Sequence, residues 1–487
     1  MTDIHANVRK CSAPGRIDAK LKNMTLSADA CYKAVLAHDH RFDGLFFTCV
    51  QSTNIYCRPI CPAVTPRREH CTFVSTAAKA EALGYRPCLR CRPEYAPGTT
   101  ETSLTAAESL AHHIDQTLMA DATFSSIAPS FGVSERHLRR TFKEAFGIEP
   151  HQYLITRRLL FAKQLLQDTA LTTANIAFAA GFGSVGRLTI TMKKAYGFTP
   201  QQLRKNAPRD SQQSLELKTA YRPPFDWESI LTFLAGRATP NERIEDGAYY
   251  RVVENGLEIR VSHLPEKSLL IVTIPAELSK QAYQLVRRVR KLFDLDADPQ
   301  AISQVLQQNS YIAPLIRQYP GIRTPGCWDE FEMLLRVIIG QQISVAGATT
   351  VMSRLINRVG ITPAAIAASS VDTIAGIGMP GKRAQTILTC GRLVQSGQLQ
   401  LQESNPTRLY NQLIGIPGIG PWTAEYIKMR ALHWPDSLPV EDLGLQKALI
   451  PGQKVTKKIL SSSLQTASPW RSYATMLLWK SLENNGG

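Results

Sequence analysis

The stretch Cys57-Arg58-Pro59-Ile60-Cys61, together with Cys88-Leu89-Arg90-Cys91, decides the fold of the N-terminal part of this chain. The two pairs have the spacings C-x3-C and C-x2-C, and each pair spans one tight turn. Four thiolates in this arrangement suit tetrahedral Zn²⁺, and a closed site of this kind normally stabilises a domain too small to fold by packing alone. The sequence therefore predicts one tetrathiolate zinc site with the ligands Cys57, Cys61, Cys88 and Cys91.

The composition of the chain favours nucleic acid as its partner. The 487 residues carry a net charge of +16 and a pI near 9.4, which suit a polyanion. No apolar run reaches the length of a membrane-spanning helix and no signal-peptide pattern opens the chain, so we expect no membrane partner and a cytoplasmic location. Basic residues crowd the cysteine segment, and we expect Arg58 among them to contact DNA. The cysteines outside the zinc spacing do not form a disulfide framework, which indicates a reducing compartment.

Shifts in composition divide the chain into several domains. Linker-like stretches at residues 93–100 and 206–214 separate the cysteine segment, a helical segment and a larger third unit, and residues 1–24 are expected to form a disordered basic leader. The expected fold is multidomain: a small zinc-bound α/β domain, an all-α domain, and an α+β unit that ends in a mainly α domain. The expected domain boundaries are 25–95, 101–205, 215–320 and 321–487.

The cysteine segment resembles the zinc-dependent methyltransferase domain of the Ada family. The resemblance runs through Gly44-x-Phe46, Thr53-x-Ile55-Tyr56-Cys57 and Gly84-Tyr85-Arg86-Pro87-Cys88. It implies that zinc-bound Cys57 irreversibly accepts a methyl group from a DNA methylphosphotriester. Because methylation removes one negative charge from the thiolate cluster, we hypothesise that it also tightens DNA binding and so reports damage. From the spacing alone, a purely structural zinc site is the alternative.

The helical segment contains an internal repeat. Ser134, Leu138, Phe142 and Phe146 recur as Ser184, Leu188, Met192 and Tyr196. Each copy predicts a helix-turn-helix with a serine N-cap and a core-facing stripe, and the exposed positions are either DNA contacts or a solvated helix face. The candidate DNA contacts are Arg136, Arg139, Arg140 and Arg187.

This repeat resembles the AraC-type DNA-binding domain, most closely at Ala179-Ala180-Gly181-Phe182-Gly183-Ser184 and Phe198-Thr199-Pro200. The resemblance implies a transcription activator that works with RNA polymerase. Two recognition helices on one chain can reach successive segments of the major groove, so we expect a monomer on double-stranded DNA.

The third unit contains a helix-hairpin-helix at Leu413-Ile414-Gly415-Ile416-Pro417-Gly418-Ile419-Gly420-Pro421-Trp422. Gly415, Gly418 and Gly420 let backbone N–H groups approach a DNA phosphate without reading sequence. Pro439-Val440-Glu441-Asp442 follows, and further motifs lie at Pro223-Pro224-Phe225 and Ile338-Ile339-Gly340-Gln341-Gln342. Together these motifs resemble the AlkA-like 3-methyladenine DNA glycosylases.

This second resemblance assigns roles within the third unit. It implies that Asp442 is the catalytic carboxylate and that Gln342 fills the gap left by a flipped base. The flipped cationic base would stack on aromatic side chains through cation–π attraction, for which we expect Trp422, Tyr426, Trp479 and Phe233. A capping aspartate and buried core aromatics are the alternatives. No lysine occupies the position of the Schiff-base residue of bifunctional relatives, so we expect base excision without strand cleavage.

The whole sequence is thus expected to encode an alkylation-response protein that combines a methylphosphotriester sensor, a transcription activator and an alkylbase glycosylase. Two rivals remain open. The chain could be a regulator whose C-terminal unit only clamps DNA. It could also be a repair enzyme whose helical domain binds DNA without regulating transcription.

Overall fold

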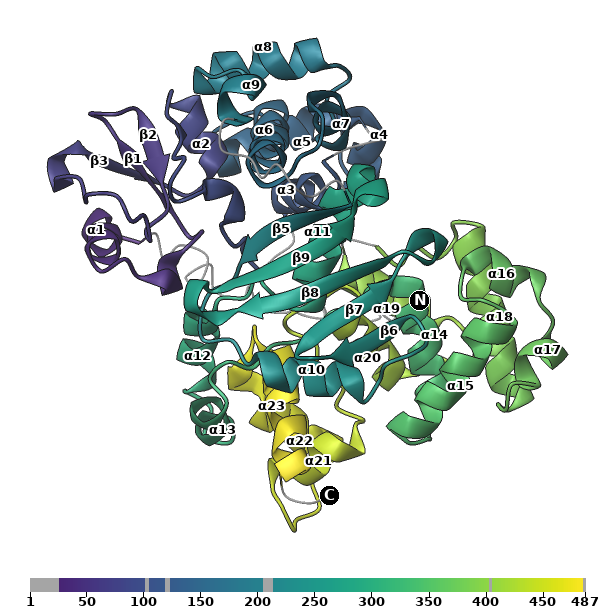
Figure 1. Cartoon of the computed structure of the whole chain (residues 1–487). Helices are drawn as coiled ribbons and strands as arrows, with labels where there is room; N and C mark the ends of the chain where they lie inside the picture. Colours follow the sequence, from purple (N-terminus) through teal and green to yellow (C-terminus); the bar gives the residue numbers. More distant parts are fainter. Residues whose placement is uncertain (1–25, 101–104, 119–122, 205–212, 403–404, 485–487) are drawn as a thin grey trace, which may run out of the picture.

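The computed structural model describes residues 26–100, 105–118, 123–204, 213–402 and 405–484. The expected leader at residues 1–24 lies outside these ranges, as does most of the predicted linker at 206–214. Figure 1 shows a central antiparallel sheet with the cysteine domain and the helical domain on one side and the C-terminal helices around the other. In the part of the chain that is described, no helix has the length and apolarity needed to cross a bilayer.

The N-terminal domain is a four-stranded sheet of order β3-β1-β2-β4 with two helices. Strand β1 runs antiparallel to β2 and β3, whereas β2 and β4 run parallel. Both cysteine pairs begin at the carboxyl ends of these two parallel strands, because Cys57 ends β2 and Cys88 directly follows β4. The element bounds are α1 Ala28–Leu36, β1 Phe47–Val50, β2 Ile55–Cys57, β3 Cys71–Val74, α2 Ala77–Ala82 and β4 Arg86–Pro87.

The next domain consists of two helix-turn-helix units joined by the long helix α6. The predicted caps are confirmed, since the hydroxyls of Ser134 and Ser184 accept hydrogen bonds from the first turns of α5 and α8. The core-facing stripe is also as predicted, because Leu138, Phe142, Leu188 and Met192 are each 0% exposed. The helices are α3 Ala106–Thr117, α4 Phe124–Ile127, α5 Glu135–Phe146, α6 Pro150–Asp168, α7 Thr173–Ala179, α8 Val185–Tyr196 and α9 Pro200–Leu203.

The central sheet has five antiparallel strands in the order β5-β9-β8-β7-β6. Leu215 and Leu217 of β5 belong to the same buried cluster as Leu165 and Leu166 of α6, so the sheet and the helical domain share one core. Because the core is continuous, it does not mark where one domain ends and the next begins, and the predicted boundaries at residues 95, 205 and 320 stay predictions. The bounds are β5 Ser214–Ala220, α10 Trp227–Ala235, β6 Glu242–Glu245, β7 Ala248–Val252, β8 Glu258–Leu264, β9 Leu269–Pro275 and α11 Ala282–Leu292.

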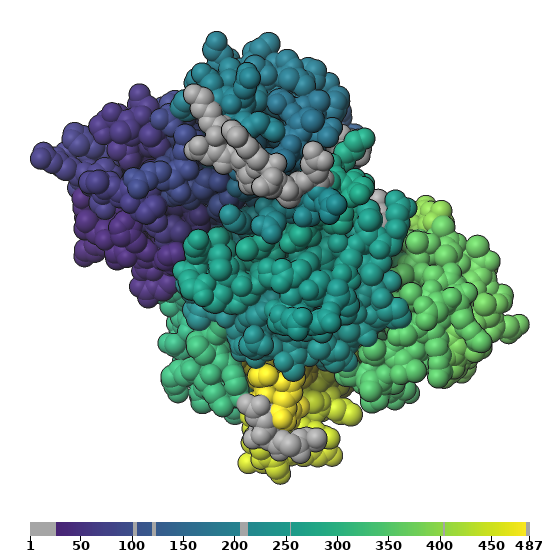
Figure 2. Space-filling view, viewed as in Figure 1, coloured from purple at the N-terminus to yellow at the C-terminus, as the bar shows by residue number. Residues whose placement is uncertain are grey.

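The C-terminal helices enclose two further hydrophobic cores. Trp422 and Tyr426 pack against the first core and Trp479 against the second, and the Tyr426 and Trp479 rings meet where the two cores adjoin. Figure 2 shows the lobes packed around the central sheet. The helices are α12 Pro299–Leu306, α13 Ala313–Gln318, α14 Glu330–Gly340, α15 Val345–Arg358, α16 Pro363–Ala368, α17 Val371–Ala375, α18 Gly381–Gln395, α19 Pro406–Ile414, α20 Pro421–Arg430, α21 Leu443–Leu449, α22 Lys457–Ser463 and α23 Arg471–Asn484.

Candidate functional site

The predicted zinc ligands form one compact cluster. The four sulfur atoms of Cys57, Cys61, Cys88 and Cys91 all lie within 4.8 Å of one another. The sulfurs of Cys61 and Cys88 are 4.0 Å apart, close to the separation of about 3.8 Å that Zn–S bonds of about 2.3 Å imply in a tetrahedron. The donor set therefore fits one zinc ion, and the cluster is a tetrathiolate zinc site.

Cys57 differs from the other three ligands in its surroundings. Cys61, Cys88 and Cys91 are 8%, 6% and 6% exposed, whereas Cys57 is only half-buried. Backbone N–H groups donate to the sulfurs of Cys91 and Cys88 at 3.3 and 3.4 Å. In the described ranges no backbone N–H donates to the Cys57 sulfur. Since a hydrogen bond draws electron density from a thiolate, the sulfur of Cys57 is less restrained than those of Cys88 and Cys91, and Cys57 is the most exposed residue of the four.

Arg58 is buried, although we expected it to contact DNA at the surface. Its side chain is 5% exposed and forms an ion pair with Asp43. One guanidinium nitrogen also donates to the carbonyl of Cys91 at 3.0 Å. The expectation is therefore corrected: Arg58 holds the two ligand pairs together from inside the domain. Arg67, whose side chain is 83% exposed, and Arg90, which lies between two of the ligands in sequence, are exposed basic residues of this domain.

The two recognition helices present most of the candidate DNA contacts to solvent. Arg136 and Arg140 on α5 and Arg187 on α8 are exposed. Arg139 is less available, because it pairs with Glu135 at 2.7 Å and lies over the ring of Phe124. Ile190 of α8 is 72% exposed on the same helix as Arg187. An exposed apolar residue gives no polar or charged signal in the sequence, so Ile190 is not among the predicted DNA contacts.

Asp442 is held by three hydrogen-bond donors. It is the N-cap of α21, and its Oδ1 accepts the backbone N–H of Leu445 at 2.9 Å. The indole N–H of Trp422 donates to Oδ2 at 2.9 Å, and that of Trp479 donates to Oδ1 at 3.2 Å. Asp442 is thus a capping residue and, at the same time, the carboxylate on which both candidate pocket tryptophans converge. Its neighbour Glu441 forms an ion pair with Lys457 instead.

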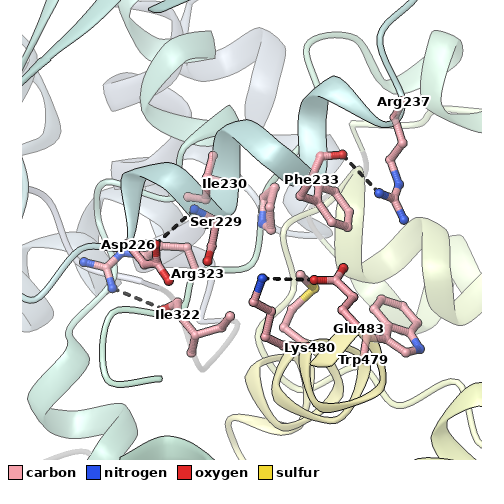
Figure 3. Close-up of a pocket in the computed structure, with 12 residues that line it drawn as sticks. Asp226, Ser229, Ile230, Phe233, Arg237, Ile322, Arg323, Trp479, Lys480 and Glu483 are labelled. Carbon is pink, nitrogen blue, oxygen red and sulfur yellow. Dashed lines mark hydrogen bonds and ion pairs between the residues drawn. The ribbon is translucent and has the colours of Figure 1, made fainter. Parts of the chain in front are cut away.

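The four candidate pocket aromatics lie together, although they come from α10, α20 and α23. The ring centroids of Trp422 and Tyr426 are 5.3 Å apart, and those of Tyr426 and Trp479 are 5.9 Å apart. Phe233 and Trp479 face one cavity of about 70 Å³, shown in Figure 3. Arg430 links the groups, since it donates to the Tyr426 hydroxyl at 2.9 Å and lies 4.8 Å from the Phe233 ring.

The hairpin between α19 and α20 lies beside this pocket, since Trp422 belongs to the first turn of α20. Gly418 has φ +94°, and a Cβ there would lie 2.1 Å from Oγ1 of Thr386, so only glycine fits. The amide of Gln341 donates to the carbonyl of Gly418 at 3.0 Å and to the hydroxyl of Thr423 at 3.1 Å. The next residue, Gln342, is exposed and has φ +62°, and it directly follows the glutamine that bonds to the hairpin.

Four family models match successive parts of the chain. The metal binding domain of Ada matches residues 30–94, and a helix-turn-helix domain matches residues 127–206. The AlkA N-terminal domain matches residues 215–329, and the HhH-GPD superfamily of base excision DNA repair proteins matches residues 335–462. These matches and the described fold confirm the predicted fold class.

Curated relatives match either nearly the whole chain or one part of it. A probable bifunctional transcriptional activator/DNA repair enzyme AlkA from Mycobacterium tuberculosis is 32% identical over 94% of this chain and 97% of its own length. DNA-3-methyladenine glycosylase 2 of Escherichia coli is 31% identical and aligns with 53% of this chain and 95% of its own length. The bifunctional transcriptional activator/DNA repair enzyme Ada of Escherichia coli is 31% identical over 38% of this chain and 51% of its own length.

Proposed function

Because this chain belongs to the family of bifunctional transcriptional activator/DNA repair enzymes, with an Ada-type zinc domain, a helix-turn-helix domain and an AlkA-type glycosylase unit, we propose that it senses and repairs alkylated DNA by two separate reactions. Cys57 accepts methyl groups from the DNA backbone, and Asp442 supports the release of N-alkylated purines of the 3-methyladenine type. The observation that carries the second reaction is the convergence of both tryptophan N–H groups on Asp442 beside a DNA-binding hairpin.

The first reaction is a methyl transfer to sulfur. The Cys57 thiolate attacks the methyl carbon of a methylphosphotriester, an S–CH₃ bond forms, the C–O bond breaks, and an ordinary phosphodiester anion leaves. A bound zinc ion would keep the cysteines ionised at neutral pH. The accessibility of Cys57 and the backbone N–H groups that restrain Cys88 and Cys91 favour Cys57 as the nucleophile. Since a thioether is a stable product, each molecule reacts once.

The second reaction is hydrolysis of an N-glycosidic bond. An N-alkylated purine already carries positive charge, so it leaves as a neutral base when its bond to the sugar breaks. Asp442 stabilises the oxocarbenium-like sugar that remains, and water then adds to the same carbon and releases one proton to the solvent. The rings of Trp422, Tyr426, Trp479 and Phe233 provide the electron-rich surfaces on which a flipped cationic base stacks. Gln342 occupies the gap left in the duplex.

The helical domain connects the sensor to transcription. Arg136, Arg140 and Arg187 are exposed on the two recognition helices, which suits base or phosphate contacts in double-stranded DNA. Gly415, Gly418 and Gly420 of the hairpin provide sequence-independent phosphate contacts for the glycosylase. We propose that the protein acts as a monomer and that promoter-bound protein methylated at Cys57 recruits RNA polymerase.

The glycosylase proposal is tested by release of free methylated base from alkylated duplex DNA. Wild type and Asp442→Asn are compared under conditions in which both bind the duplex, with Glu441→Gln as the matched control. We expect Asp442→Asn to lower the rate of base release at least about a hundredfold. Glu441→Gln should release base at the wild-type rate. No release by the wild type would reject the glycosylase and leave a regulator that uses the hairpin as a clamp.

The regulatory proposal is tested with a promoter reporter in cells treated with a methylating agent. A response that survives Asp442→Asn but is lost in Cys57→Ala supports a sensor that works independently of base excision. No response in any variant, with base release intact, would leave a repair enzyme whose helical domain only anchors DNA.

A further inference from the structure

Helix α2 of the zinc domain contacts the C-terminal ends of both recognition helices. The ammonium group of Lys79 donates to the carbonyl of Gly147, the C-cap of α5, at 3.3 Å. The carboxylate of Glu81 accepts the hydroxyl of Tyr196, the last residue of α8, at 3.0 Å. Two side chains on one short helix thus contact the same end of each repeat.

Glu81 also connects α8 to the strand that carries Cys57. Its Oε1 accepts the hydroxyl of Tyr56, the residue before Cys57, at 3.0 Å, and its Oε2 accepts the hydroxyl of Thr156 in α6 at 2.7 Å. Tyr56 is 0% exposed and Tyr196 is 3% exposed, so both tyrosine donors lie in the protein core. A carboxylate with three hydroxyl donors from three elements restrains their relative positions.

Apolar packing supports the same contact. Ala78 of α2 is 1% exposed and belongs to the core of the first helix-turn-helix, with Leu138 and Phe142. Leu160 of α6 in turn packs into the core of the zinc domain beside Tyr56. Arg86 of β4 lies 5.2 Å from the ring of Phe198, which follows α8. The zinc domain and the helical domain are therefore interlocked and do not behave as modules on a flexible linker.

The two repeats differ at the position that Glu81 contacts. Tyr196 in the second copy corresponds to Phe146 in the first, which has no hydroxyl. The first copy is instead tied to α2 by Lys79, whose positive charge also suits the negative end of the α5 dipole. The hydroxyl of Tyr196 is thus a feature of the second copy that its role as a core aromatic does not require.

We propose that α2 positions both recognition helices relative to Cys57, with Lys79 and Glu81 as its positioning residues, so that one DNA duplex meets all three in a fixed register. The inference rests on the proposed methyl transfer and on DNA binding by the two helices. It predicts that the protein repairs a phosphotriester most efficiently at one particular distance from its recognition sequence.

The test uses the full-length zinc protein and a set of duplexes. Tight-binding sequences are first selected from random double-stranded DNA, and a single methylphosphotriester is then placed at successive phosphates beside the selected site. Methyl transfer to Cys57 is followed by mass spectrometry. We expect transfer by the wild type to peak at one position and to fall about tenfold when the triester is moved by half a helical turn, about five base pairs.

The variants are Tyr196→Phe, which removes one hydroxyl, and Lys79→Met, which removes one charge. Tyr196→Phe should lower the ratio between the best and the worst position by about fivefold, the effect of one hydrogen bond to a carboxylate, and Lys79→Met should lower it by about twofold, because its hydrogen bond is exposed. Tyr283→Phe is the matched control, because its hydroxyl donates to the carbonyl of Asp115 and does not involve α2. Base release by all variants, measured in parallel, checks that they fold.

The outcomes separate the two proposals. Transfer that peaks in the wild type and flattens in both variants, but not in the control, supports the inference. Transfer by the wild type that is independent of position, or a peak that both variants retain, overturns the inference while the methyl transfer stands. An absence of transfer at every position rejects the proposed methyl transfer and the inference with it.

Discussion

At the scale of single residues, the environment of Asp442 sets the strongest expectation. Trp422 and Trp479 each donate one indole N–H to its carboxylate, so each fixes one oxygen. Trp479→Phe keeps an aromatic face for stacking but removes one donor. We expect it to lower kcat for base release by about tenfold with little change in KM, because a hydrogen bond to a charged group contributes about 1.5–3 kcal/mol. A change in KM alone would mean that Trp479 acts only by stacking.

Glu81 leads to a prediction about pH. Burial raises the pKa of Glu81 to about 7, although the hydroxyls of Thr156, Tyr56 and Tyr196 lower it. The folded protein thus holds this proton more tightly than the unfolded chain, and the resulting stability is lost as pH rises through about 7. The unfolding free energy of the wild type should therefore decrease between pH 5 and 8. We expect this decrease to be smaller in Glu81→Gln. Denaturant unfolding of both proteins at several pH values measures this difference.

The comparison with Glu81→Gln isolates the effect of Glu81, because the other ionisable groups near this residue are the same in both proteins. Glu94, which is paired with Lys163, is the other carboxylate that acts on Tyr56 and Tyr196. Both proteins retain this pair, so a pH dependence common to both cancels in the comparison. Equal slopes for the two proteins would contradict the prediction.

Individual residues also show where sequence reasoning reaches its limit. The spacing of the four cysteines predicts their cluster, because each ligand pair is local in the chain. Arg58 was expected on the surface, but its partner Asp43 belongs to a loop before β1, and no periodic pattern links the two. The hydroxyl donors of Glu81 come from residues 56, 156 and 196, so only the folded chain shows them together.

At the scale of elements, the hairpin between α19 and α20 gives a prediction with an internal control. Gly418 has φ +94° and an added Cβ would meet Oγ1 of Thr386, whereas Gly420 has open space around its Cα. We expect Gly418→Ala to destabilise the protein by about 1–3 kcal/mol and to weaken binding to undamaged duplex. Gly420→Ala should leave stability nearly unchanged. Thermal unfolding and DNA titration measure both, and equal effects would contradict this account of the hairpin.

The elements themselves were the most predictable level of this protein. The serine caps and the recurring apolar stripe predict α5 and α8, and the glycine-rich hairpin predicts the turn before α20, because each signal lies within one local segment. The contacts between these elements could not be predicted from local sequence signals. The contact of α2 with the ends of α5 and α8 depends on side chains far apart in sequence.

At the scale of the whole molecule, the domains are fastened to one another by buried polar contacts. Arg222 of the third unit is 0% exposed and donates to the carbonyls of Asp43 and Gly98, which belong to the N-terminal part of the chain. It also donates to the carbonyls of Asp296 and Ala297 at 2.9 and 3.0 Å. The zinc domain is thus bonded to the glycosylase unit as well as to the helical domain.

The zinc domain and α6 share a buried ion pair that makes this coupling measurable. Lys163 of α6 and Glu94 have side chains 0% and 1% exposed, with 2.6 Å between their charged atoms. If removal of zinc unfolds the small domain, Lys163 loses its partner and becomes an uncompensated buried charge, which costs about 3–5 kcal/mol. We expect a zinc chelator to increase backbone hydrogen exchange in α6 as well as in the zinc domain. Helix α18, which packs in a separate core, serves as the control and should exchange as before. Increased exchange confined to residues 26–95 would show that the zinc domain unfolds independently, and the interlocked arrangement would then have no energetic consequence.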